Sequence, residues 1–108
     1  MSRFAEVLQR LTETIASRRG GDPKTSWSAR LLADPTLASK KLAEEALETS
    51  LAAVQQDKAA VVAESADLIY HWLVVLVAAG VTLDEVAAAL EAREGQSGVE
   101  EKASRKKR

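Results

Sequence analysis

The stretch from Leu68 to Ala79 constrains the fold more than any other part of the chain, because nearly all of its side chains are apolar. A helix that is apolar on every side must be covered on every side. The chain has 108 residues and only a few other short elements that could provide this cover. We therefore expect a second subunit to complete it. The stretch is too short to span a bilayer, and we expect no membrane partner.

Composition favours helices throughout. Hydrophobic residues make up 46% of the chain but aromatic residues only 4%, with 5 Gly and 2 Pro. The apolar content is mostly Ala, Leu and Val, and Ala and Leu are strong helix formers. This predicts one domain of the all-α class, a helical bundle completed by dimerisation.

Cysteine is absent and His71 is the single histidine. Disulfides and a cysteine-based zinc site are therefore excluded. The first residues lack the apolar core of a signal peptide. Together these features predict a cytoplasmic protein.

Apolar periodicity and capping residues predict five helices. Asp34 and Pro35 mark one helix start, Asp57 another, and Thr82 with Glu85 forms a capping-box pattern. Gly80 is a plausible helix end. The predicted helices cover residues 3–18, 26–33, 35–56, 58–79 and 83–93. The third has an apolar stripe of Ala43, Leu47, Leu51 and Val54, and the last is expected to bury Leu83, Val86 and Leu90.

Charge is distributed unevenly along the chain. Residues 95–108 hold five basic and two acidic residues, which leaves 10 basic and 14 acidic residues in the body. We predict a folded domain over 1–94 and a disordered charged tail over 95–108. An acidic body argues against non-specific binding of nucleic acid.

Two successive helices carry closely spaced carboxylates. The first has Glu44, Glu45 and Glu48, and the second has Glu64 and Asp67. A short connection at residues 55–58 makes the two helices antiparallel neighbours. Because Glu48 precedes this connection by about two turns and Glu64 follows it by about two turns, the two groups should be level.

Converging carboxylates repel one another unless a cation compensates them. Carboxylate oxygens suit Mg²⁺, which keeps several waters and also binds phosphates. The pattern therefore favours metal-assisted hydrolysis of a phosphoanhydride. The alternative is that these side chains are only a solvated acidic surface, as isolated glutamate pairs on helices usually are.

The spacing Glu44-Glu45-x-x-Glu48 followed by Glu64-x-x-Asp67 resembles the motif of the MazG-like, all-α nucleoside triphosphate pyrophosphohydrolases. Within that superfamily the chain is most similar to the phosphoribosyl-ATP pyrophosphatase family. The likeness lies in residues 26–32, 40–46, 64–71 and 81–86. It implies Mg²⁺-dependent hydrolysis of phosphoribosyl-ATP to phosphoribosyl-AMP and pyrophosphate, the second step of histidine biosynthesis, by a homodimer. Trp27, Ser28 and Arg30 stand where Tyr, Thr and Lys are expected, which affects specificity more than the reaction.

The resemblance also implies roles for individual residues. Glu45, Glu48, Glu64 and Asp67 would be catalytic residues and metal ligands, with Glu44 as a further metal-site residue. Lys41, one turn before Glu45, is a candidate for phosphate binding. The full set of expected substrate-binding residues is Ser26, Arg30, Lys40 and Lys41. Trp27 could stack on a base, but the sequence favours a core position for it. His71 is more typical of a hydrogen-bonded structural residue than of a metal ligand.

Two other functions are compatible with the same residues. A house-cleaning pyrophosphatase acting on non-standard or deoxynucleotides would use the same metal site. The stretch 26–32 and the pair Tyr70-His71 argue against it. A helical dimerisation or adaptor module would leave the carboxylates as plain surface and would release no pyrophosphate from any nucleotide.

Overall fold

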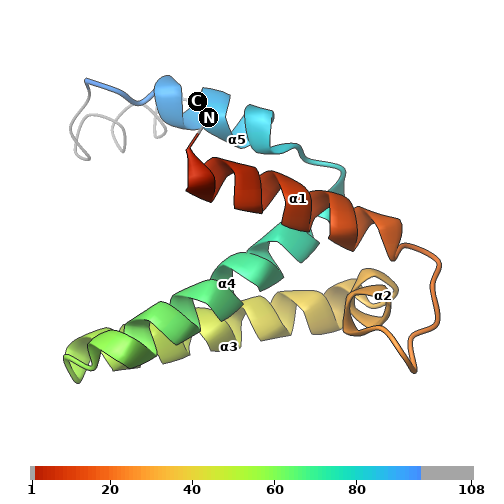
Figure 1. The fold of residues 1–108 in the computed structure, drawn as a ribbon, viewed down its shortest axis with the longest axis horizontal. Helices are drawn as coiled ribbons and strands as arrows, with labels where there is room; N and C mark the ends of the chain where they lie inside the picture. Colours follow the sequence, from red (N-terminus) through yellow and green to blue (C-terminus); the bar gives the residue numbers. More distant parts are fainter. Residues whose placement is uncertain (1, 96–108) are drawn as a thin grey trace, which may run out of the picture.

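The computed structural model describes residues 2–95, and within this range all regular structure is helical. The helices are α1 (Arg3–Ser17), α2 (Trp27–Leu32), α3 (Pro35–Val54), α4 (Lys58–Ala79) and α5 (Leu83–Glu91), arranged as Figure 1 shows. This confirms the all-α class. The tail predicted over 95–108 lies outside the described residues, apart from Gly95.

Polar side chains cap the helices at the predicted positions. The side chains of Asp34, Asp57 and Thr82 each accept a hydrogen bond from a backbone N–H three residues on. Gly80 ends α4 in the left-handed conformation, with φ of 72°. The third helix ends at Val54 rather than Gln56, because Gln56 has a positive φ of 58° that cannot continue a right-handed helix.

The antiparallel pair α3 and α4 forms the body of the molecule, and α1 crosses the second half of α4 (Figure 1). Helix α2 packs at one end of this pair, against both α3 and α4. A hydrogen bond of 2.7 Å from the Arg19 guanidinium to the Val77 carbonyl joins the loop after α1 to the end of α4. The core is built around Ile15, Leu31, Ala38, Leu73, Val74 and Leu76.

The second half of α4 is covered within the chain to a greater extent than the sequence predicts. Leu73, Val74, Leu76 and His71 are buried, under cover that comes from α1, α2 and α3. The expectation that one chain can hardly cover this stretch was therefore wrong for these residues. By length and composition alone, α4 could also cross a membrane, a test that the core helix of a soluble protein passes too.

Large apolar residues are exposed on two other helices. Leu47, Leu51 and Val54, here called the α3 stripe, have exposed fractions of 60%, 50% and 80%. They are exposed because α3 meets α4 through other positions, among them the small buried residues Ala38 and Ala52. Leu90 of α5 is 58% exposed as well, so the prediction that it is buried was wrong, whereas Leu83 and Val86 pack against the core.

We predict that Gly80→Ala destabilises the protein by about 1 kcal/mol, because a Cβ is unfavourable in the left-handed conformation. Urea unfolding followed by circular dichroism measures this. Gly80→Asn is the matched control and should cost less, since Asn tolerates this conformation better than Ala. Equal stability of Gly80→Ala and the unmodified protein would contradict the prediction.

Candidate active site

Three carboxylates from two helices meet beside the α3–α4 contact. One oxygen each from Glu45 and Glu48 of α3 and Glu64 of α4 lie within 4.8 Å of one another. The short turn between Val54 and Lys58 sets this register, because it makes the helices antiparallel and places Glu48 level with Glu64. The predicted convergence is confirmed for these three residues, which could hold a metal ion.

The other two predicted metal-site residues lie outside this group of three. Asp67 is exposed, one turn beyond Glu64, yet its negative charge contributes to raising the pKa of Glu45. Glu44 pairs instead with Lys41, whose ammonium group lies 3.1 Å from a Glu44 oxygen. The structure therefore brings together Glu45, Glu48 and Glu64, with Asp67 at their edge and Glu44 in a separate ion pair.

The three carboxylates perturb one another strongly. Contact with Glu48, together with partial burial and the proximity of Glu45, raises the pKa of Glu64 to about 7. Burial and the charge of Glu48 raise the pKa of Glu45 as well. One oxygen of Glu45 and one of Glu64 are buried without a hydrogen-bond partner. Hard oxygen donors with no internal partner fit a divalent cation such as Mg²⁺, which supplies the missing positive charge.

The predicted substrate-binding residues lie in different surroundings. Lys41 is close enough to Glu45 and Glu48 for their charges, after that of Glu44, to raise its pKa. Lys40 and Arg30 are exposed. Ser26 caps α2, where its hydroxyl accepts the backbone N–H of Ala29 at 3.1 Å. Lys41 is thus the predicted cation that the structure places beside the carboxylates.

A hydrogen-bonded chain of aromatic residues joins α2 to α4. The His71 Nδ1 lies 2.7 Å from the Asp67 carbonyl oxygen and the Trp27 indole N–H donates to His71 Nε2 at 3.4 Å. Because the carbonyl only accepts, His71 carries its proton on Nδ1. The hydrogen bonding predicted for His71 is confirmed. The core position favoured for Trp27 was wrong, since 40% of its surface is exposed.

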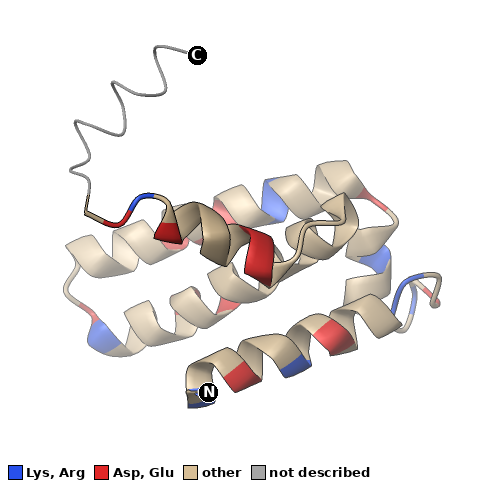
Figure 2. Cartoon of the chain, turned by 90° about the horizontal axis from the view of Figure 1, so that it is seen from above, with Lys and Arg blue, Asp and Glu red and all other residues tan. Residues whose placement is uncertain are grey.

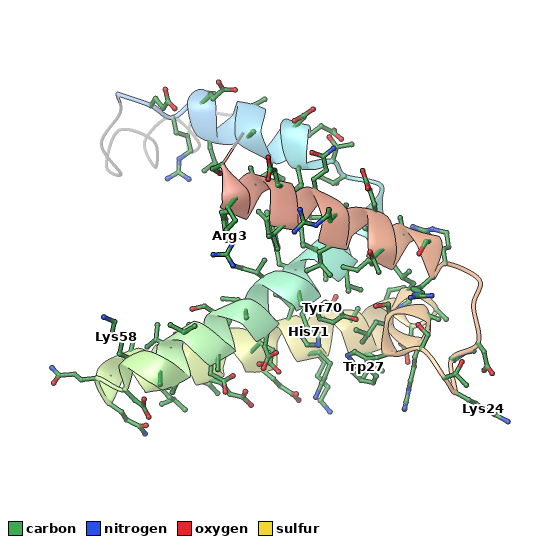
Figure 3. The ribbon with its side chains drawn as sticks, viewed as in Figure 1. Arg3, Lys24, Trp27, Lys58, Tyr70 and His71 are labelled. Carbon is green, nitrogen blue, oxygen red and sulfur yellow. The ribbon has the colours of Figure 1, made fainter. Side chains whose placement is uncertain are left out.

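The sequence did not predict the link between Ser28 and Tyr70. Their hydroxyl oxygens lie 2.6 Å apart and fix α2 against α4. Tyr70 lies next to His71 and near Trp27, as Figure 3 shows. No spacing or periodicity in the sequence links these two residues, because they come from different helices. Basic residues are scattered along the described helices rather than gathered on one of them (Figure 2).

An all-α bundle with such a carboxylate cluster is what the resemblance to the helical pyrophosphohydrolases implies. The family model for phosphoribosyl-ATP pyrophosphohydrolase matches residues 8–94. The chain belongs to this family.

Relatives named phosphoribosyl-ATP pyrophosphatase match nearly the whole chain. One from Caulobacter vibrioides is 62% identical over 103 residues, which are 95% of this chain and 96% of the relative. One from Paracoccus denitrificans is 54% identical over 100 residues, covering 92% and 93% of the two chains. One from Cereibacter sphaeroides is 52% identical over 100 residues, covering 92% and 97%. The similarity therefore spans all five helices.

The raised pKa values predict that the metal-free protein loses stability as pH increases. Glu64 has a pKa of about 7 when folded against an ordinary value of 4.5, and the pKa of Glu45 is shifted in the same direction. Between these two pH values the folded state binds more protons than the unfolded state, so the free energy of unfolding falls as pH rises. Thermal melting in EDTA at pH 5.5 and pH 8 measures the effect. Glu64→Gln should flatten it, and a wild-type protein that melts higher at pH 8 would contradict it.

Proposed function

We propose that this protein hydrolyses phosphoribosyl-ATP to phosphoribosyl-AMP and pyrophosphate in a Mg²⁺-dependent reaction, the second step of histidine biosynthesis. The family match over residues 8–94 supports the substrate and the reaction. The single structural observation that carries the proposal is the meeting of Glu45, Glu48 and Glu64 within 4.8 Å. Hydrolysis of a polyphosphate requires a positive charge that neutralises the phosphate oxygens, and this cluster can bind a metal ion that supplies it.

Glu45, Glu48, Glu64 and Asp67 would hold the metal, with Glu44 beside them. Mg²⁺ bound there would neutralise phosphate charge and lower the pKa of a bound water. Without metal the neighbouring carboxylates raise the pKa of Glu64 to about 7, and Mg²⁺ held among them would favour the charged form that binds it. The protein contributes the fixed geometry, since two rigid helices hold these side chains.

Lys41 is the residue we assign to a substrate phosphate. Its ammonium pairs with Glu44 at 3.1 Å and is partly exposed, so it can exchange this partner for a phosphate without leaving the site. Arg30, Lys40 and Ser26 are proposed as further substrate contacts. Arg30 and Lys40 are exposed on α2 and α3, and Ser26 retains a hydroxyl proton to donate while it caps α2.

We also propose that the protein works as a cytoplasmic homodimer with neither nucleic acid nor membrane as a partner. The support for the homodimer is the α3 stripe, together with Val62 of α4, which is 66% exposed. Large apolar side chains gathered on one helix face mark an interface. A second copy that covers this face would bury it by twofold symmetry.

Replacing Glu48 by Gln, or Asp67 by Asn, should reduce phosphoribosyl-ATP turnover about a hundredfold or more. Each change preserves shape but removes one charge from the metal site, and a positioned metal supplies several kcal/mol of transition-state stabilisation. Pyrophosphate release with Mg²⁺ measures turnover. Asp84→Asn on α5 is the control and should leave it unchanged.

The same variants separate chemistry from folding. Without metal the carboxylates repel, so Glu48→Gln should melt at the same temperature as the unmodified protein or higher. Mg²⁺ should raise the melting temperature of the unmodified protein, because it binds the folded state selectively, and that of the variant much less. Loss of activity accompanied by unfolding of both variants would mean that these carboxylates are structural.

Dimerisation through the α3 stripe predicts that Leu51→Lys separates the subunits. Leu51 is half exposed in the single chain, so the substitution should not unfold a monomer, but a buried charge at the interface is costly. Sedimentation at micromolar concentration distinguishes the two states. Leu90→Lys changes a residue of similar exposure on α5 and should leave the dimer intact. A compact monomer for the unmodified protein would refute the proposed assembly.

A further inference from the structure

Trp27 is an exposed aromatic residue that is nevertheless fixed in position. Its indole is 40% exposed. The indole N–H donates to His71 Nε2 at 3.4 Å, and the two rings meet edge to face with centroids 6.5 Å apart. His71 is itself anchored to the Asp67 carbonyl at 2.7 Å. A large ring that is held through one edge and remains 40% exposed suits a binding platform better than a core position.

The anchor places Trp27 in line with the carboxylates. Asp67 and His71 are one helical turn apart on α4, and Glu64 lies a further turn back, so the spacing from Glu64 to His71 is roughly 10 Å along the axis. Lys41 lies on the neighbouring helix about level with His71, because it precedes Glu48 by as many residues as His71 follows Glu64. Its ammonium extends toward the carboxylates, where it pairs with Glu44 at 3.1 Å. Along α4 the groups therefore run from carboxylates to a cation to an aromatic face, as Figure 3 shows for Trp27 and His71.

A nucleotide has the matching order of groups, from polyphosphate through ribose to a flat base. We propose that the exposed face of Trp27 stacks on the purine base of the substrate and thereby determines recognition of the nucleotide. This inference rests on the proposed function and adds a base-binding residue to its site. Phosphates at the carboxylate end and the base on Trp27 would fix the scissile bond between two anchored ends.

The surroundings of the indole support this assignment. The Arg30 guanidinium lies over the ring, 5.6 Å from its centroid, in a cation–π contact that helps to fix the indole and covers part of one face. The other tryptophan, Trp72, packs against the core and has no comparable exposure. Base stacking on an aromatic side chain is a substantial contribution to nucleotide binding and needs no hydrogen bonds to the base.

Two substitutions isolate the aromatic face. Trp27→Leu and Trp27→Phe both lose the N–H that binds His71, but only Trp27→Phe retains a flat ring. For pyrophosphate release from phosphoribosyl-ATP with Mg²⁺, Trp27→Leu should raise KM about tenfold or more while kcat stays within about twofold. Trp27→Phe should restore KM to within a few-fold of the unmodified protein.

Inhibition by pyrophosphate, a product without a base, gives the matched control. Its inhibition constant should be the same in Trp27→Leu as in the unmodified enzyme, because the phosphate end is intact. An unchanged KM in Trp27→Leu would overturn the inference, and so would an equal rise of KM in Trp27→Leu and Trp27→Phe. A pyrophosphate inhibition constant that rises in Trp27→Leu as much as KM does would also overturn it. A wild-type protein that releases no pyrophosphate would instead remove the proposed function.

Fluorescence tests the contact without turnover. Trp72→Phe leaves Trp27 as the single tryptophan, and addition of phosphoribosyl-AMP with Mg²⁺ should quench its emission, whereas pyrophosphate should not. If Trp27 emission does not change when phosphoribosyl-AMP is added at concentrations that saturate the enzyme, no base reaches the ring. The kinetic comparison does not depend on this variant, so the inference remains testable if Trp72→Phe does not fold.

Discussion

Antiparallel packing of α3 on α4 is the interaction on which the rest of the structure depends. It buries the small residues Ala38 and Ala52 and, by its register, forces Glu45, Glu48 and Glu64 together. The apolar contacts thus work against the repulsion of the carboxylates. A folded protein can keep this conflict only if the packing outweighs it, and the raised pKa values of Glu45 and Glu64 are its electrostatic signature. A cation bound among these carboxylates would replace their mutual repulsion by attraction to the ion.

Helix α4 combines two tasks that are usually separate. Its second half is the core of the molecule, with Leu73 and Val74 fully buried, while its first half carries Glu64. His71 lies at the boundary and belongs to both halves, since it is buried and also binds Trp27. A side chain at the site is therefore rigid because it extends from a helix whose other end cannot move without breaking the core.

Much of this arrangement could be predicted from the sequence. The caps at Asp34, Asp57 and Thr82 act through local hydrogen bonds, and the turn at residues 55–58 sets the register of the carboxylates, so both could be predicted from neighbouring residues. Tertiary packing could not be predicted in this way. Periodicity showed that Leu47 and Leu51 share a face but not whether α4 covers it, and it assigned Trp27 to the core because exposure depends on how α2 docks. The pairing of Lys41 with Glu44 depended on side-chain geometry in the same way.

The hydrogen bonds of His71 have a consequence for the choice of metal. Both ring nitrogens form hydrogen bonds, Nδ1 with the Asp67 carbonyl and Nε2 with the Trp27 indole, and the ring lies one turn from Asp67 and two turns from Glu64. The chain contains no other histidine and no cysteine. A metal ion at the carboxylates therefore meets oxygen donors alone, and ions such as zinc and copper lose the nitrogen or sulfur ligands that give them their advantage. With the imidazole occupied internally, the oxygen ligands that remain would suit a hard cation such as Mg²⁺ better than ions that prefer nitrogen or sulfur.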